Sequence, residues 1–152
     1  MILIFIFVLA VLCFIAIPGK KPQNVGLQNL TKLADCDEQK QNCVSSKATT
    51  AYHTMIPWMV LNKSEFMKNL AKIIKEDPQS NIIIQNEKYI YAQYQSNYFK
   101  FIDDVEFILT DNNEVHFRSS SRLGRKDFKV NRKRILKLHD KLLNLGLSIS
   151  NL

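Results

Sequence analysis

The sequence predicts an α+β domain in which a mostly antiparallel sheet of four or five strands is packed on one side by two helices. Apolar residues recur with helical spacing in residues 62–77 and 131–145, and with a period of two in the segments between 81 and 118. The chain has 152 residues, 46% of them hydrophobic and 23% charged, which is enough for one domain with a real core. We place that domain at residues 33–147.

The first seventeen residues carry no charged side chain and are followed by a Pro-Gly-Lys-Lys sequence. Such a run cannot lie on a soluble surface, so we expect a membrane segment over residues 1–19. No Lys or Arg precedes it and no small-x-small motif ends it, which favours an uncleaved signal anchor over a cleaved signal peptide. Residues 20–32 are polar and contain proline and glycine, a composition typical of a linker.

The side of the membrane on which the domain lies is open to two arguments. Lys20 and Lys21 follow the apolar run, and the positive-inside rule would keep the domain in the cytoplasm. Cys36 and Cys43 are an even pair closing a short loop, which indicates a disulfide and an oxidising compartment; two free thiols in a reducing cytoplasm are the alternative. We expect a membrane-anchored, extracytoplasmic domain, on the periplasmic side of an inner membrane, with the cytoplasmic orientation as the alternative.

The first helix and first hairpin have clear local signals. Residues 52–61 are apolar and interrupted by proline, which predicts an edge strand or an extended lead-in. Asn62 with Glu65 three residues later matches a capping box, and the predicted helix ends before the Asp-Pro pair at 77–78. A hairpin follows over 81–95. The residues predicted to face the core from the helix are Phe66, Met67, Leu70, Ile73 and Ile74.

A second hairpin carries most of the informative polar residues. Matching its apolar faces predicts a three-residue turn at 111–113, with Phe107 opposite Phe117. Glu106 then lies opposite Arg118 on the other face. The same register places Asp104 opposite Ser120 and diagonal to Arg118 and Arg122, so acidic and basic side chains neutralise one another across the strands. A register shifted by two residues would pair Asp104 with Arg122 instead.

The second helix follows a turn at Gly124. Asn131 is predicted to cap it and Gly146 to end it. The residues expected to face inward are Ile135, Leu138, Leu142 and Leu145. The formal net charge of +7 is concentrated between 118 and 141, a basic tract suited to phosphates or anionic head groups. A solvated helix face with structural ion pairs is the alternative.

Three ordered motifs resemble a known family: CDEQKQNCVSS at 36–46, FIDDVE at 101–106 and FRSSSRLGRKDFKVNRKRI at 117–135. Over about residues 33–145 the chain resembles the domain of unknown function 1499 family. The resemblance implies no assigned activity, and it implies a small bacterial or plastid domain behind a signal or membrane segment. In that family proline often follows the first cysteine, whereas here Asp37 follows Cys36, which implies a less rigid loop.

For function, we expect a non-catalytic binding or envelope-associated structural module for an anionic ligand, a lipid head group or a protein partner. The alternative is a hydrolytic enzyme using the carboxylate and arginine cluster. Asp103 and Asp104 would point to opposite faces of a strand and could not act as a pair. The candidate ligand-binding residues are Asp104, Glu106, Arg118, Ser120, Arg122, Arg125, Asp127, Asn131, Arg132 and Arg134.

We predict no metal site and no cofactor. The three histidines lack metal-ligand spacing, and the sequence contains no glycine-rich phosphate loop. Aromatic residues between 89 and 99 suggest a stacking surface for bases or sugars, but packing within the sheet explains them better. There is accordingly no specific nucleic-acid signal, and the predicted partners are the membrane, through residues 1–19, and an anionic ligand or envelope protein.

Overall fold

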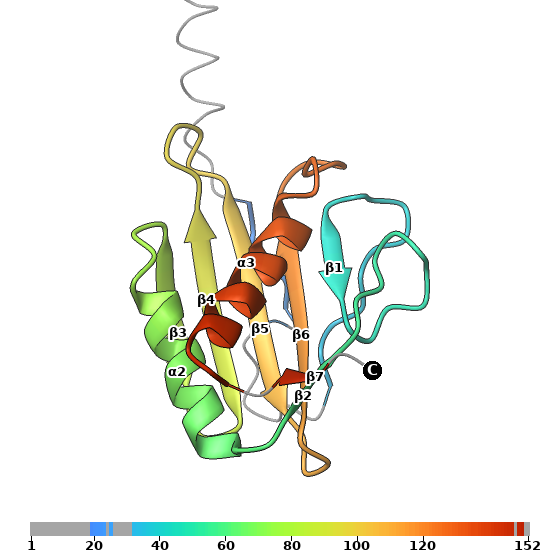
Figure 1. The fold of residues 1–152 in the computed structure, drawn as a ribbon. Helices are drawn as coiled ribbons and strands as arrows, with labels where there is room; N and C mark the ends of the chain where they lie inside the picture. The colour runs from blue at the N-terminus through green and yellow to red at the C-terminus, as the bar shows by residue number, and fades with distance from the viewer. Residues whose placement is uncertain (1–18, 24, 26–31, 148, 151–152) are drawn as a thin grey trace, which may run out of the picture.

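The computed structural model describes residues 19–23, 25, 32–147 and 149–150. In this part of the chain, two α-helices cover the same face of one β-sheet, which confirms the predicted α+β class (Figure 1). The predicted membrane segment lies outside the described residues except for Gly19. Among the residues that are described, no helix is long and apolar enough to cross a bilayer.

The sheet is built around four long antiparallel strands in the order β3-β4-β5-β6. Strand β6 also pairs with β1 and β2, and β2 pairs with β7, which gives seven strands among the described residues instead of the predicted four or five. Strands β1, β2 and β7 span only two or three residues, too few to show a period of two. The bounds are β1 Cys43–Ser45, β2 Trp58–Val60, β3 Ser80–Gln85, β4 Tyr89–Gln95, β5 Ile102–Leu109, β6 Glu114–Ser121 and β7 Ile149–Ser150.

Helix α2 (Lys63–Lys75) begins where its capping residues predict. The Asn62 side-chain carbonyl accepts a hydrogen bond from the Glu65 backbone N–H at 3.1 Å, and the Asn62 amide donates to the Glu65 carboxylate at 3.0 Å. All five predicted core residues of this helix are buried. The apolar face of α2 is therefore correctly predicted from its spacing.

Helix α3 (Val130–Asn144) corrects two expectations. Asn131 does not cap it: Asp127 accepts hydrogen bonds from the backbone N–H groups of Lys129 and Asn131, each at 2.9 Å, while Asn131 is fully buried in the first turn. Leu145 does not face inward and is 54% exposed, because the helix stops at Asn144. Gly146, at φ 74°, turns the chain at this end as predicted.

Between the helices and the sheet lies an aromatic core centred on Trp58. Its ring centroid lies 4.9 Å from that of Phe117, 5.8 Å from that of Phe107 and 6.0 Å from that of Phe66. Each of these side chains is at most 3% exposed. Burying one large apolar side chain contributes about 1.5–3 kcal/mol, so this cluster is a main source of stability.

The opposite face of the sheet is also buried. Val25, from the segment predicted to be a linker, is fully buried, and Leu33 is 3% exposed; both pack with Tyr89, Tyr91 and Ile108. The polar residues of β5 and β6 that point away from the helices therefore lie beneath the N-terminal part of the chain. This burial decides the properties of the candidate site.

Candidate functional site

The register of β5 and β6 is the predicted one. Asp104 pairs with Ser120, Glu106 with Arg118, and Phe107 with Phe117. In the three-residue turn between the strands, Asn113 adopts the left-handed conformation at φ 65°. The predicted ladder of acidic and basic side chains therefore exists, and the structure places it in the interior.

Asp104 and Arg122 form the strongest pair of this face. Arg122 Nε donates to Asp104 Oδ2 and Arg122 Nη2 to Asp104 Oδ1, each at 2.8 Å, in the two-point geometry that a planar guanidinium favours. The side chains are 1% and 8% exposed for Asp104 and Arg122. Hydrogen bonding to Asp104 raises the pKa of Arg122 above its ordinary value. The residue directly opposite Asp104 on β6 is Ser120, and Arg122 lies two positions further along the chain. The strand register alone therefore does not identify Arg122 as the partner of Asp104.

Two tyrosines of β4 complete the hydrogen bonding of the acids. Tyr91 donates to Asp104 Oδ1 at 2.7 Å, and Tyr89 donates to Glu106 Oε1 at 2.6 Å. Gln93 donates to the Tyr91 hydroxyl at 2.8 Å. Burial, followed by the hydrogen bond to Asp104, raises the pKa of Tyr91 to about 12. The tyrosines are thus donors to buried carboxylates, and their faces are not free for stacking.

Arg118 is the least well paired of the buried cations. Its Nη1 lies 3.9 Å from Glu106 Oε2, at the limit of ion-pair contact, and its side chain is 7% exposed. Within the described residues, Nε and Nη1 form no hydrogen bond. Burial lowers the pKa of Arg118, and the charges of Glu106 and Asp104 act in the opposite direction.

A second polar cluster lies on the helix side of the sheet, at the start of α3. Arg134 donates to Asp103 Oδ2 at 2.6 Å and to Asn131 Oδ1 at 2.7 Å, and its guanidinium carbon lies 4.5 Å from the centre of the Tyr94 ring. Asp103 and Asp104 do point to opposite faces, as predicted. Ser119 donates to the same Asn131 oxygen at 2.6 Å.

Asn131 connects segments that are far apart in the sequence. Its side-chain amide donates to the Asn42 carbonyl at 3.0 Å, to Ser121 Oγ at 3.0 Å and to Asp127 Oδ2 at 2.8 Å. Asn42 in turn donates to the Gly124 carbonyl at 2.7 Å. This network joins the cysteine loop, β6 and α3, which indicates a structural role for Asn131 and Asp127.

The ten predicted site residues therefore do not form one site. Arg132 donates to the carbonyls of Tyr52 and Thr54 at 2.6 and 3.0 Å, and Arg125 is exposed, with a 3.3 Å hydrogen bond to the Gln39 carbonyl. The rest fall into the two clusters on opposite faces. Four hydrogen-bond partners of the site residues were not predicted from the sequence: Tyr89, Tyr91, Gln93 and Ser119. The alternation of side chains along β4 and β6 would have placed them on the same faces as the residues that they contact.

The predicted pairing of the cysteines is confirmed. Cys36 and Cys43 form a disulfide that closes the loop preceding β1. Next to it, the His53 ring lies 2.6 Å from the Lys40 carbonyl through Nε2 and 2.5 Å from the Thr50 hydroxyl through Nδ1. In the described part of the chain, no group of His, Cys, Asp and Glu side chains is arranged to hold a metal ion.

These features define a small α+β domain whose sheet is closed on one face by an aromatic core and on the other by buried ion pairs. A family model described as a protein of unknown function, DUF1499, matches residues 32–142. The chain therefore belongs to this uncharacterised family, as the three sequence motifs suggest. No curated protein and no solved structure matches the chain.

Proposed function

We propose that this chain is a membrane-anchored, extracytoplasmic module without catalytic chemistry, which binds an anionic ligand through its exposed basic residues. The observation that supports this is the contrast between paired and unpaired cations. Arg122 and Arg134 are held by buried carboxylates at 2.6–2.8 Å. Lys126, Lys129 and Lys133 are exposed and make no ion pair within the described residues.

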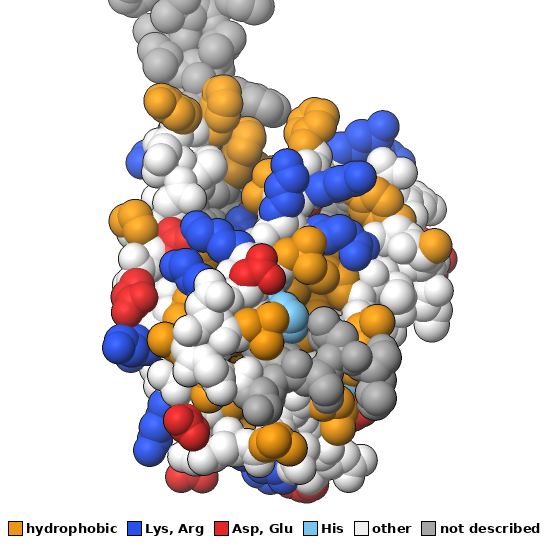
Figure 2. Space-filling model, in the orientation of Figure 1, with side chains coloured by type: hydrophobic (Ala, Val, Ile, Leu, Met, Phe, Trp, Pro, Cys, Tyr) orange, Lys and Arg blue, Asp and Glu red, His pale blue; other side chains and the backbone are white. Residues whose placement is uncertain are grey.

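The exposed cations lie close together along the start of α3. Figure 2 shows the Lys and Arg side chains gathered over the upper part of the helix face, where α3 begins. Cations on one exposed surface attract phosphates and anionic head groups, and their attraction is screened by salt. The loop disulfide supports an oxidising compartment, and the apolar first seventeen residues support a membrane anchor.

The hydrolytic alternative requires a carboxyl group open to a substrate. Asp104 and Glu106 are each 1% exposed, and each accepts a hydrogen bond from a tyrosine hydroxyl. A general acid or base must come within hydrogen-bond reach of its substrate, so this arrangement weighs against catalysis at the ladder.

The test is retention on lipid vesicles of a chain that begins at Lys20. We expect retention on vesicles rich in anionic lipid, no retention on neutral vesicles, and a loss of binding as salt increases. A variant with Lys126, Lys129 and Lys133 all changed to Glu should lose at least tenfold in affinity, since each cation near such a surface contributes about 1 kcal/mol.

The matched control changes three exposed lysines of α2, Lys68, Lys72 and Lys75, to Glu. It alters the net charge equally, so it should reduce binding far less if position on the surface matters. Equal retention on neutral and anionic vesicles would exclude the head-group version of the proposal. Equal losses in the two triple variants would show that net charge alone acts.

A further inference from the structure

One end of the domain exposes aromatic side chains. Residues 96–101 connect β4 to β5 and residues 122–129 connect β6 to α3; we call these two loops the tip. Their roots are neighbours, since the Arg122 backbone N–H donates to the Ile102 carbonyl at 3.0 Å, and Figure 1 shows both loops at the upper end of the sheet. The exposed apolar residues of the tip are Tyr98 (88%), Phe128 (85%), Phe99 (53%), Phe101 (44%) and Leu123 (40%).

The tip aromatics do not serve the core of the domain. Phe99 and Phe101 stack on each other, with ring centroids 5.4 Å apart, and remain exposed. Phe128 and Lys129 both have left-handed backbone conformations, at φ 53° and 67°, which residues other than glycine rarely adopt. This turn lets Asp127 accept hydrogen bonds from the backbone N–H groups of Lys129 and Asn131, whereas the Phe128 ring itself stays exposed.

The charge of the tip is positive. Its exposed cations are Lys100, Arg125, Lys126 and Lys129. Asp127 is the single carboxylate in these loops, and its two oxygens accept hydrogen bonds from the backbone N–H groups of Lys129 and Asn131. Aromatic and basic side chains therefore occupy the same end of the domain, and Figure 2 shows hydrophobic and basic side chains side by side there.

The chain also enters the domain at the tip. The Gly19 carbonyl accepts a hydrogen bond from Arg122 Nη1 at 3.4 Å. A Cβ atom at Gly19 would lie 2.8 Å from Leu123 Cγ, so the backbone is packed closely against this loop. The seventeen apolar residues of the predicted anchor end two positions before Gly19. A membrane that holds the anchor would therefore face the tip.

We infer that the tip docks into the interfacial layer of the bilayer that holds the anchor. The aromatic side chains would enter the boundary between head groups and acyl chains, where amphipathic rings are favoured, and the four cations would contact anionic head groups. This inference rests on the proposed function, and it commits that function to a lipid surface instead of a soluble anion or a protein.

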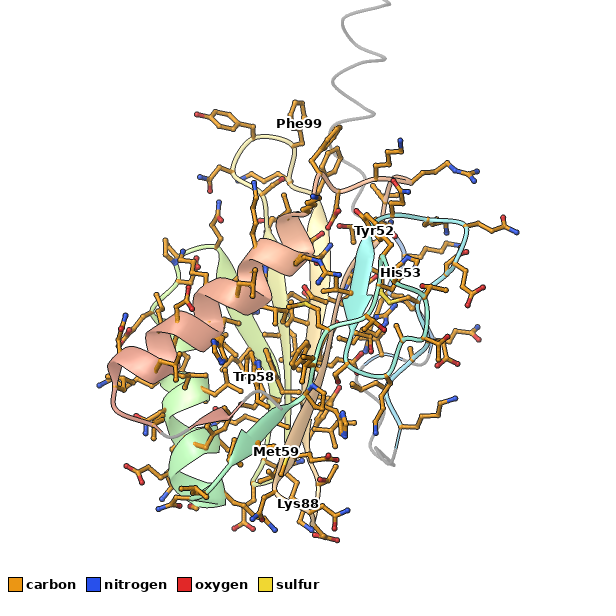
Figure 3. All side chains as sticks on the ribbon, turned by 45° about the vertical axis from the view of Figure 1, so that its right-hand side comes forward. Tyr52, His53, Trp58, Met59, Lys88 and Phe99 are labelled. Atoms are coloured by element: carbon orange, nitrogen blue, oxygen red, sulfur yellow. A yellow bond between two sulfur atoms is a disulfide. The ribbon has the colours of Figure 1, made fainter. Side chains whose placement is uncertain are left out.

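The experiment uses the full chain reconstituted into vesicles of phosphatidylcholine and phosphatidylglycerol with brominated acyl chains, which quench tryptophan on contact. Phe128→Trp places a reporter in the tip. Leu61→Trp is the matched control, because Leu61 is 80% exposed and follows Val60, whose N–H donates to the Asn113 carbonyl in the turn at the other end. Figure 3 shows the same two ends, marked by Phe99 and Lys88.

We expect the added fluorescence of F128W to be quenched at least twofold by brominated lipid and that of L61W to be unchanged. The buried Trp58 provides the common background, which is subtracted using the unmodified chain. Equal, weak quenching of both variants in vesicles that retain the chain would overturn tip docking and leave the anchor intact. Release of the full chain by alkaline washing would overturn the anchored function itself.

Discussion

The middle of each sheet face is deeply buried, with aromatic side chains on the helix side and charged side chains on the other. On the helix side, Phe107 and Phe117 are fully buried against Trp58. On the other side, Asp104 and Glu106 are as deeply buried, yet they are carboxylates held by a guanidinium or a tyrosine. Apolar packing tolerates small changes in geometry, whereas removing one partner of a buried ion pair leaves an uncompensated charge in the interior. The faces should therefore fail in different ways.

The largest effect is expected on the apolar face. Phe107→Ala should lower the free energy of unfolding by about 3–5 kcal/mol, because the ring is fully buried and the cavity cannot be filled by its aromatic neighbours. Denaturation of the chain from Lys20 onward, followed by Trp58 fluorescence, measures it. Phe128→Ala is the control: that ring is 85% exposed, so its loss should change stability by no more than about 0.5 kcal/mol.

On the polar face, the free energy of unfolding should depend on Asp104 and Arg122 being present together. Arg122→Met leaves the Asp104 carboxylate buried without its cation and should cost about 3 kcal/mol. Adding Asp104→Asn should cost less than the sum of the two single changes, with a coupling energy of about 1–3 kcal/mol.

Arg125→Met serves as the control for the loss of an arginine, since Arg125 is exposed. It should change the free energy of unfolding by less than about 0.5 kcal/mol. If Arg122→Met proved as mild as this control, the Asp104–Arg122 pair would have no structural importance, and the comparison between the two faces would fail.

The smallest effect is one of alkaline pH. The folded-state pKa of Tyr91 is raised to about 12, above the ordinary value of about 10. The protonated hydroxyl is the stabilised form, so its contribution is complete below pH of about 10 and is lost as the pH rises toward 12.

Burial also raises the pKa of Tyr94 above its ordinary value. Ultraviolet titration of tyrosinate absorbance should therefore show late titration by both tyrosines, and Tyr91→Phe should remove the step near pH 12. Tyr98→Phe, at a tyrosine that is 88% exposed, should retain that step. A step near pH 12 that is unchanged by Tyr91→Phe would mean that burial and the hydrogen bond to Asp104 do not raise the pKa of Tyr91.

Local signals in the sequence determined much of this fold. The Asn62–Glu65 cap, the apolar face of α2 and the register of Phe107 with Phe117 all follow from interactions between residues close in sequence or directly opposed across a hairpin. The cysteine pair at 36 and 43 is of the same kind, since a short loop brings the two residues together.

Only the tertiary structure decided which polar residues are buried and which partners they contact. Val25 and Leu33 pack on the second face of the sheet with Tyr89, Tyr91 and Ile108, and the role of Asn131 depends on Asn42, far away in sequence. The spacing of apolar residues does not predict such contacts, because they join segments whose separation along the chain follows no rule. The sequence could therefore identify the charged residues, while their partners, and hence which cations stay exposed, were set by how the whole chain packs.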